Sequence, residues 1–267
     1  MKIKLLTLED AQNDNVTEML DALNKKRQQA VDQGDEALAN DCWREIEALE
    51  LNLLFVEAFH KLGEHQYREA WHDLERCEIK CESLKRNTSD QYFERSRARF
   101  IQQMVTRWQS LYPYCIFVSP AMTVGYYECS ICGHKIRPRS RCTHQKGRVY
   151  LGELCVHVAR DVQLGEISLV TNPVQKYSVL HNDETLDFSL ISHLREMLDH
   201  PFEPWDLNWT TKKFPRERFS AVTGDAACPC KSGKAFGDCC IDQPEVEIPH
   251  VDFLLSKQVT VKEQFPN

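Results

Sequence analysis

Residues 228–240 have the sequence CPCKSGKAFGDCC, in which four thiols lie within 13 residues in the pattern C-x-C-x8-C-C. Cys228, Cys230, Cys239 and Cys240 are soft ligands of the kind that Zn²⁺ binds in a tetrahedron, and the Ser-Gly-Lys turn allows both pairs to face one ion. So short a segment has no hydrophobic core of its own, and metal–thiolate bonds would supply its folding energy. Four protein ligands leave no open coordination position, so we expect a structural zinc. A redox-active thiol cluster is the alternative.

The same segment resembles the SEC-C motif, a zinc module at the C-terminus of the bacterial preprotein translocase ATPase and of many unrelated proteins. The four cysteines match the motif position by position, as do Pro229, Ser232, Gly233 and Lys234. Phe236 stands where the motif usually has tyrosine, Lys231 where it usually has glycine, and Ala226-Ala227 replace its polar lead-in. The resemblance covers about residues 228–241. It implies a bacterial protein whose module binds a partner, such as a chaperone or the ribosome, without chemistry of its own.

A second cysteine cluster lies in the stretch ECSICGHKIRPRSRCTHQKGRVYLGELCVH at residues 128–157. C-x2-C-G is the pattern of a zinc knuckle, whose turn directs both sulfurs to one ion while the glycine relieves the backbone. The stretch offers more candidate ligands than zinc needs: Cys129, Cys132, His134, Cys142, His144, Cys155 and His157. We expect Cys129, Cys132, Cys142 and Cys155 to bind the ion, with His144 as a substitute for Cys142 or as a group that supports a ligand. His134 and His157 are expected to be surface or packing residues.

The composition of the 267 residues is that of a soluble globular protein, with 42% hydrophobic and 27% charged residues. The N-terminus has no long apolar run, and no stretch approaches the roughly 18–20 apolar residues of a membrane span. We therefore expect a cytoplasmic protein with no membrane partner. In that reducing compartment, clustered cysteines indicate metal ligands before disulfides. Of the twelve cysteines, Cys42, Cys77, Cys81 and Cys115 fall outside the two clusters.

The net charge of −7 argues against general electrostatic attraction to nucleic acid. Residues 135–148 nevertheless contain six basic residues and no acidic one. They are Lys135, Arg137, Arg139, Arg141, Lys146 and Arg148. Such side chains on a loop held by a metal ion can bind phosphates, and Tyr126, Tyr127 and Tyr150 offer rings for base stacking. The alternative is a solvated loop whose charges complement the acidic helices of the same chain.

Between Cys129 and about Leu180, the features CSICG, C-x-H, G-x-x-Y-x-G-x-x-C and GEISLVTNPVQKYS are loosely similar to the zinc ribbon of phage-type head maturation proteins. No serine–histidine pair matches the nucleophile and base of those proteases, so the resemblance implies no protease activity. Ser168 and Ser178 are expected to be structural. Some nucleases place a histidine base beside a zinc knuckle, which makes His144 or His157 a candidate base in a hydrolase hypothesis.

Apolar residues recur at helical spacing through residues 10–111. Breaks at Gly34-Asp35, Gly63, Asn87-Thr88-Ser89 and Tyr112-Pro113 predict four antiparallel helices joined by short loops. The pair around Gly63 resembles the helix pair of a tetratricopeptide repeat (TPR-like), but no second copy follows, so an ordinary helical hairpin is favoured. From about residue 114, short β-branched and aromatic segments separated by glycine and proline predict a β-rich region.

Together these patterns predict an α+β protein in four parts. The parts are a helical domain at residues 1–112, a β-rich zinc-ribbon domain at 113–200 closed by a helix at 183–200, an extended linker at 201–223, and a SEC-C zinc module with its tail at 224–267. We expect two structural Zn²⁺ ions and a non-enzymatic adaptor that mediates protein–protein contacts. Nucleic-acid binding (RNA or DNA) through residues 135–148 is the first alternative, and a zinc-dependent hydrolase, protease or nuclease is the second.

Overall fold

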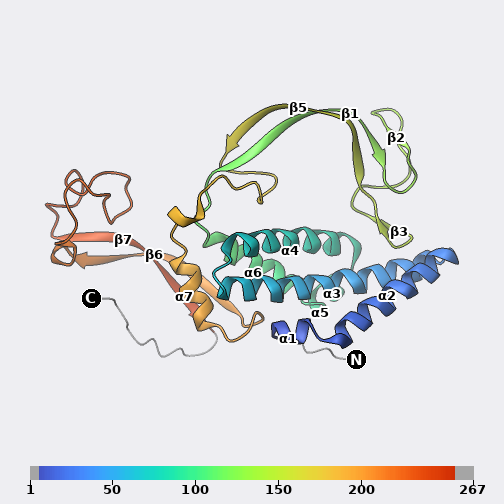
Figure 1. Ribbon diagram of the computed structural model, residues 1–267, viewed down its shortest axis with the longest axis horizontal. Coiled ribbons are helices and arrows are strands. Elements are labelled where there is room, and N and C mark those ends of the chain that lie inside the picture. The colour runs from blue at the N-terminus through green and yellow to red at the C-terminus, as the bar shows by residue number, and fades with distance from the viewer. Residues whose placement is uncertain (1–5, 256–267) are drawn as a thin grey trace. The chain divides into compact units, whose positions relative to one another are not determined.

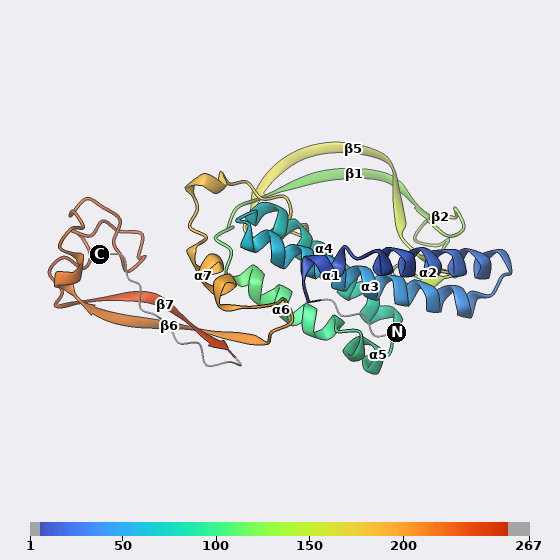
Figure 2. The same cartoon turned by 60° about the horizontal axis from the view of Figure 1, so that its bottom comes forward.

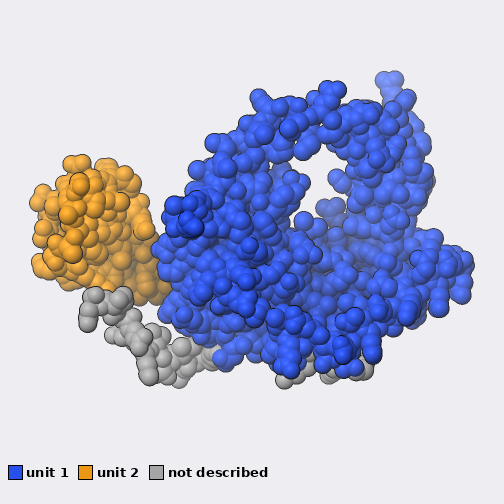
Figure 3. Space-filling model, viewed as in Figure 1, with its two compact units in different colours: residues 1–203 blue, residues 204–267 orange. Residues whose placement is uncertain are grey.

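The computed structural model describes residues 6–255, whose fold combines helices with small antiparallel sheets. The α+β class is therefore as predicted. The chain divides into two compact units, residues 1–203 and 204–267, which Figure 3 colours separately. The expected division at residue 112 does not separate two units, because the β-rich segment is hydrogen-bonded to the helices at both of its ends.

The first unit is built on a helical core. Its α-helices are α1 (Leu8–Ala11), α2 (Asp14–Asp32), α3 (Glu36–Gly63), α4 (Tyr67–Asn87), α5 (Asp90–Arg95), α6 (Ala98–Ser110) and α7 (Ser189–Met197). α3 packs against both α2 and α4, and α6 packs on α4 (Figure 1). Asp35 caps α3 by accepting a hydrogen bond from the Leu38 N–H, and α3 ends at Gly63 as predicted. Phe55 of α3 and Trp108 of α6 are among the largest fully buried side chains.

Two predicted helices differ from the observed ones. The fourth is broken between α5 and α6 at Arg97, whose φ is +66°. This conformation costs a non-glycine residue roughly 1–2 kcal/mol. Tertiary contacts hold the break: Asn52 Nδ2 donates to the Ser96 carbonyl at 3.0 Å, and the Arg97 guanidinium lies 4.4 Å from the Phe202 ring centroid. The helix expected at 183–200 is a short 3-10 turn, η1 (Asp183–Thr185), followed by the shorter α7.

A long two-stranded ribbon forms the β-rich part of the first unit. β1 (Phe117–Cys129) pairs antiparallel with β5 (His157–Val170), with a bulge between Pro120 and Met122. The short strand β2 (Lys135–Ile136) pairs with the end of β1, and β3 (Val149–Tyr150) forms a hairpin with β4 (Glu153–Leu154). The ribbon arches over the helices in Figures 1 and 2, and Figure 3 shows an opening beneath it.

The near end of the ribbon is fixed to α4 by the chain that follows β5. The Lys176 carbonyl accepts a hydrogen bond from Trp71 Nε1 at 2.6 Å, and the Lys176 N–H donates to Glu75 Oε1 at 2.6 Å. Glu75 is buried, and this burial raises its pKa although backbone N–H groups donate to it. Farther along, Arg68 forms an ion pair with Asp183.

The far end of the ribbon is fixed to the helical core through two asparagines. Asn87 at the end of α4 accepts from the Val149 N–H at 3.0 Å and donates to the Gly147 carbonyl at 2.9 Å. Asn40 of α3 accepts from the Gly152 N–H at 2.7 Å. These bonds satisfy backbone groups of the loop between β2 and β4, so the loop is positioned by the helices.

The second unit is organised by one strand pair, β6 (Trp205–Pro215) with β7 (Glu245–Leu255), and a 3-10 turn, η2 (Arg216–Phe219). The prediction of an extended linker at residues 201–223 is therefore wrong over most of its length. The partner strand β7 comes about thirty residues later in the chain, so no local pattern revealed the pairing. This unit begins at residue 204 and not at 224. The last part of the expected tail, residues 256–267, lies outside the described residues.

Candidate metal centres

The first centre, called the central centre below, forms where β1 ends in a tight turn. Gly133 has a φ of +68°, and its N–H donates to the Cys129 carbonyl at 2.9 Å. The Cys129 N–H donates in turn to the His134 carbonyl at 3.0 Å. Glycine adopts this left-handed conformation without a Cβ clash. The turn therefore brings the sulfurs of Cys129 and Cys132 together, as the C-x2-C-G pattern predicts.

Five of the predicted donors meet at the central centre. The ligand atoms of Cys129, Cys132, Cys142 and His144 all lie within 4.8 Å of one another. Cys129 Sγ is 3.7 Å from His144 Nδ1 and 3.7 Å from Cys155 Sγ. Sulfurs bound at about 2.3 Å to one tetrahedral zinc ion stand about 3.8 Å apart, and a disulfide would hold them at about 2.05 Å. The separations fit shared coordination of one ion.

The central centre has one donor more than a tetrahedral ion takes. The compact four-donor group contains His144, whereas the sequence favoured Cys155. Cys155 is fully buried, and its backbone is fixed by a 2.8 Å hydrogen bond from the Gly147 N–H and another of 2.8 Å to the Arg148 carbonyl. The His144 ring meets the Tyr150 ring edge-on, with centroids 4.7 Å apart. Both side chains are thus held beside the Cys129 sulfur.

Local hydrogen bonds favour the thiolate form of Cys129. Its burial opposes ionisation, but donation from the backbone N–H groups of Cys132 and Ile131 lowers the pKa of the thiol to about 6. Burial, together with the neighbouring Cys129, raises the pKa of Cys155 to about 11. The thiolate is the form that binds a metal, so these hydrogen bonds favour the metal-binding form of Cys129.

The second centre, called the C-terminal centre below, is built within one short loop of the second unit. The Cys228 N–H donates to the Lys234 carbonyl at 2.9 Å, which closes the loop that carries Cys230. Lys231 and Gly233 have φ values of +59° and +80° and turn the chain back on itself. Glycine reaches this conformation easily, but lysine does not. The Lys231 backbone is therefore strained at a position where a glycine would be relaxed.

Phe236 fixes the second pair of cysteines. Its carbonyl accepts from the N–H groups of Cys239 at 3.2 Å and of Cys240 at 3.1 Å. Its ring is 2% exposed and packs with Cys228 and Val246 in the core of this unit. A single buried aromatic residue thus orients one cysteine pair through its backbone and covers the other pair with its side chain.

The four sulfurs of the C-terminal centre also fit one ion. All of them lie within 4.8 Å of one another, with Cys239 Sγ 3.5 Å from Cys230 Sγ and 3.7 Å from Cys240 Sγ. The Ser232 hydroxyl lowers the pKa of Cys230 to about 6, and the Cys228 thiol acts in the same direction. Burial, followed by the neighbouring thiols, raises the pKa of Cys240 to about 12. This centre can therefore hold a metal ion on the four predicted cysteines.

The remaining candidate residues lie apart from both centres. His134 Nε2 is 3.2 Å from the Ser140 hydroxyl, and the His157 ring lies against Tyr127. The basic residues of the loop are all exposed: Lys135, Arg137, Arg139, Arg141, Lys146 and Arg148. Lys135 Nζ lies 3.4 Å from the centroid of the Tyr126 ring, so that ring is covered on one face.

Two features of the first unit were missed in the sequence. One is an exposed apolar face on the β1–β5 ribbon, which the alternation of Val118, Pro120, Met122 and Val124 could have revealed. The other is an arginine-lined cavity between the helices and the residues that lead from His144 into β3. Its residues come from segments far apart in the chain, so no local sequence pattern predicts it.

Comparison of the chain with protein families, with curated proteins and with solved structures finds no significant match. Across residues 6–255, no helix combines the length and the apolar character that crossing a bilayer requires. Any functional assignment therefore depends on the geometry of the sites themselves.

Proposed function

We propose that this chain is a zinc-stabilised, non-enzymatic adaptor that holds a protein partner on the apolar face of its β1–β5 ribbon. The observation that carries the proposal is this exposed face. Residues directly opposite each other on two paired strands point to the same side of the sheet. Four successive cross-strand pairs on one side are apolar: Val118 with Leu169, Pro120 with Ile167, Met122 with Leu164, and Val124 with Val162.

The apolar face of the ribbon is exposed to an unusual degree. Leu164 is 64% exposed, Ile167 63% and Leu169 66%. A contiguous apolar surface of this kind is typical of protein–protein contact sites. Among residues 6–255, β5 has a strand neighbour only on its β1 side, so a partner can also add an extended segment to the open edge. An apolar, extended protein segment is the partner that this surface fits best.

Zinc is the metal that best fits both centres. It prefers thiolate and imidazole donors in a tetrahedron, and four protein ligands give a closed, structural site. The central centre lies where β1 ends at Cys129 and two residues before β5 begins at His157. An ion held by Cys129 fixes the far end of β1, with Cys155 packed beside it just before β5, and an isolated two-stranded ribbon is only marginally stable in water. The metal thus supports the surface that contacts the partner. Reduced thiols of this kind persist in the cytoplasm.

The test compares the two faces of the same strand. A variant carrying Leu164→Thr, Ile167→Thr and Leu169→Thr removes the apolar face and keeps good strand formers. A control carrying Gln163→Thr and Ser168→Thr changes the opposite face. Each is expressed in cells with a photo-crosslinking amino acid at position 122, and crosslinked proteins are identified by mass spectrometry.

We expect the control to retain the crosslinked partner and the apolar-face variant to lose it, with zinc content unchanged in both. Identical crosslinking by the two variants would contradict the proposal. Crosslinking only to a second copy of the chain, with a dimer in sedimentation velocity, would show that the face serves self-association and not an adaptor role.

The second candidate function is nucleic-acid binding, which the exposure of all six basic side chains of residues 135–148 favours. Arginine and lysine contacts to phosphates give binding that weakens as salt rises. The triple variant Arg137→Ala, Arg139→Ala and Arg141→Ala should then lower the affinity for a single-stranded RNA and reduce the salt dependence, as measured by fluorescence anisotropy. Unchanged affinity would rule this function out for the loop.

A further inference from the structure

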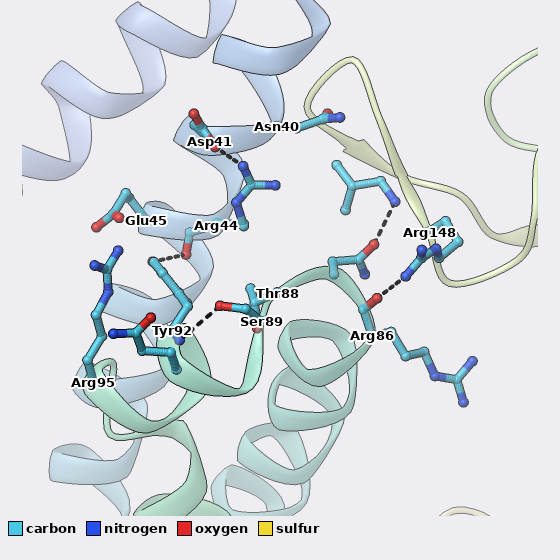
Figure 4. A pocket seen from close by; sticks show the side chains of 13 residues that line it. Asn40, Asp41, Arg44, Glu45, Arg86, Thr88, Ser89, Tyr92, Arg95 and Arg148 are labelled. Carbon is cyan, nitrogen blue, oxygen red and sulfur yellow. Dashed lines mark hydrogen bonds and ion pairs between the residues drawn. The ribbon is translucent and has the colours of Figure 1, made fainter.

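A cavity of about 770 Å³ lies in the first unit between α3, the turn from α4 to α5, and the residues that lead into β3 (Figure 4). Its volume is within the range of sites that bind small molecules, roughly 300–1,000 Å³. The cavity is separate from the sulfur atoms of the central centre, although both involve the same loop. It is also separate from the apolar face of the ribbon.

The walls of the cavity carry a surplus of positive charge. Four arginines line it, Arg44, Arg86, Arg95 and Arg148, against two acidic residues, Asp41 and Glu45. Asp41 forms an ion pair with Arg44. The lining residues therefore carry four positive charges and two negative ones, although the Arg86 guanidinium points away from Arg44 (Figure 4), and the imbalance favours an anionic occupant.

Two of the arginines are held in place and still have free donors. The Arg148 guanidinium donates to the Arg86 carbonyl, and Figure 4 shows it on the opposite side of the turn from Arg44, whose guanidinium meets Asp41. A guanidinium has five N–H groups, so these contacts leave donors available on both. The backbone around Arg148 is fixed by the hydrogen bond between Asn87 and Val149.

The uncharged groups of the wall also favour an acceptor-rich ligand. Asn40 uses its oxygen to accept from the Gly152 N–H, which leaves its amide N–H groups free to donate. The Ser89 hydroxyl oxygen accepts from the Tyr92 N–H at 3.2 Å, so its proton is free to be donated. The cavity thus offers a surplus of N–H and O–H donors beside its surplus of positive charge.

We propose that this cavity binds a phosphoryl group between Arg44 and Arg148. Planar guanidinium groups bind phosphate oxygens through pairs of parallel hydrogen bonds, which a carboxylate-poor, donor-rich wall allows. The phosphoryl group belongs either to a free nucleotide or to the 5′ end of an oligonucleotide, since both fit the same donors. This inference does not depend on the partner proposed for the ribbon.

A phosphoryl group in this position would join two parts of the first unit. Arg44 belongs to α3, whereas Arg148 belongs to the loop that also carries Cys142 and His144. A ligand that contacts both arginines adds to the asparagine hydrogen bonds that already attach this loop to the helices. Binding should therefore raise the thermal midpoint of unfolding, and the midpoint should keep rising with the logarithm of the ligand concentration above Kd.

The experiment measures binding of two probes to the zinc-loaded full chain at low salt. ADP is titrated by calorimetry, and a fluorescent 5′-phosphorylated ten-nucleotide RNA is titrated by anisotropy, with the same RNA lacking the phosphate as reference. The variants are Arg44→Ala and Arg148→Gln, because glutamine keeps a donor for the Arg86 carbonyl. Arg139→Ala is the matched control for the ADP arm, since Arg139 is exposed, as Arg148 is, but does not line the cavity.

We expect at least one probe to bind, and each cavity variant to weaken it at least about tenfold, as removal of a charged hydrogen-bond donor predicts. Arg139→Ala should leave ADP affinity unchanged. ADP binding without a preference for the RNA phosphate identifies a free nucleotide, and the reverse identifies an oligonucleotide end. Failure of both probes to bind, or binding that neither Arg44→Ala nor Arg148→Gln weakens, would overturn the proposal.

Discussion

The C-terminal and central centres use similar donors but are assembled in different ways. The C-terminal centre takes all its ligands from residues 228–240, and its loop is closed by hydrogen bonds within residues 224–241. The central centre gathers donors between Cys129 and Cys155, and the loop that carries them is attached to α3 and α4 through Asn40 and Asn87. The hydrogen bonds that shape the C-terminal centre are local, although Phe236 and Cys228 also pack on Val246 of β7, whereas the loop of the central centre is held by separate helices. Loss of metal should therefore have local consequences in the first case and wider ones in the second.

The largest expected effect is loss of one metal from each centre in turn. Wild-type protein should contain about two zinc ions per chain, and Cys228→Ser and Cys132→Ser should each lower the content to about one, as measured by elemental mass spectrometry. Structural zinc contributes on the order of 10–16 kcal/mol of apparent binding free energy, which is also folding free energy. Hydrogen exchange should then rise within residues 224–248 of the second unit in Cys228→Ser, because Val246 and Ile248 pack on the centre, but along β1 and β5 of the first unit in Cys132→Ser. Equal, local changes in both variants would break the distinction between the centres.

The next effect concerns the surplus donor of the central centre. Because the compact group contains His144, His144→Ala should lower zinc affinity at this centre at least about a hundredfold, and Cys155→Ser should lower it less. Cobalt substitution provides the measurement, since three sulfurs with one nitrogen and four sulfurs give different visible spectra. A four-sulfur spectrum that Cys155→Ser abolishes would instead assign Cys155 as the ligand, as the sequence favoured.

A smaller effect tests the dependence of the central centre on the helices. Asn87→Ala removes hydrogen bonds to Val149 and Gly147 and should cost about 1–3 kcal/mol in the free energy of unfolding of the first unit. Zinc should also leave the central centre faster in competition with a chelator, while the C-terminal centre keeps its rate. Asn24→Ala is the control, because Asn24 donates only to the Leu20 carbonyl within α2. Equal effects of the two substitutions would contradict the proposed attachment.

The smallest effect compares one backbone conformation in the two centres. Gly133 and Lys231 both have positive φ, and a Cβ on Gly133 would meet no atom within 4 Å. Gly133→Ala should therefore destabilise the central centre by about 1 kcal/mol through backbone strain alone, and Lys231→Gly should stabilise the C-terminal centre by up to about 1 kcal/mol. Chelator competition on the full chain measures both. Lys234→Gly, where φ is not positive, should give no gain, and a gain as large as that of Lys231→Gly would show that strain is not the cause.

Much of the helical core was visible in the sequence because its signals are local. The apolar period and the cap at Asp35 predicted α3, and Gly63 marked its end. The break at Arg97 was not visible, since a left-handed arginine is tolerated there only because Asn52 and Phe202 contact the segment. Strand β6 was missed for the same reason, because its strongest signal is its pairing with β7, which is distant in the chain.

The sequence by itself identified the four thiols that cluster in the C-terminal centre and the turn of the central one, because cysteines at short spacing and a glycine at positive φ act within a few residues. Tertiary structure alone decided how His144 and Cys155 compete beside Cys129, that residues 204–215 belong to a folded unit, and that Arg44 and Arg148 share one cavity. These arrangements join residues distant in the chain. They depend on packing and hydrogen bonds that form only when the whole unit folds, so no local pattern encodes them.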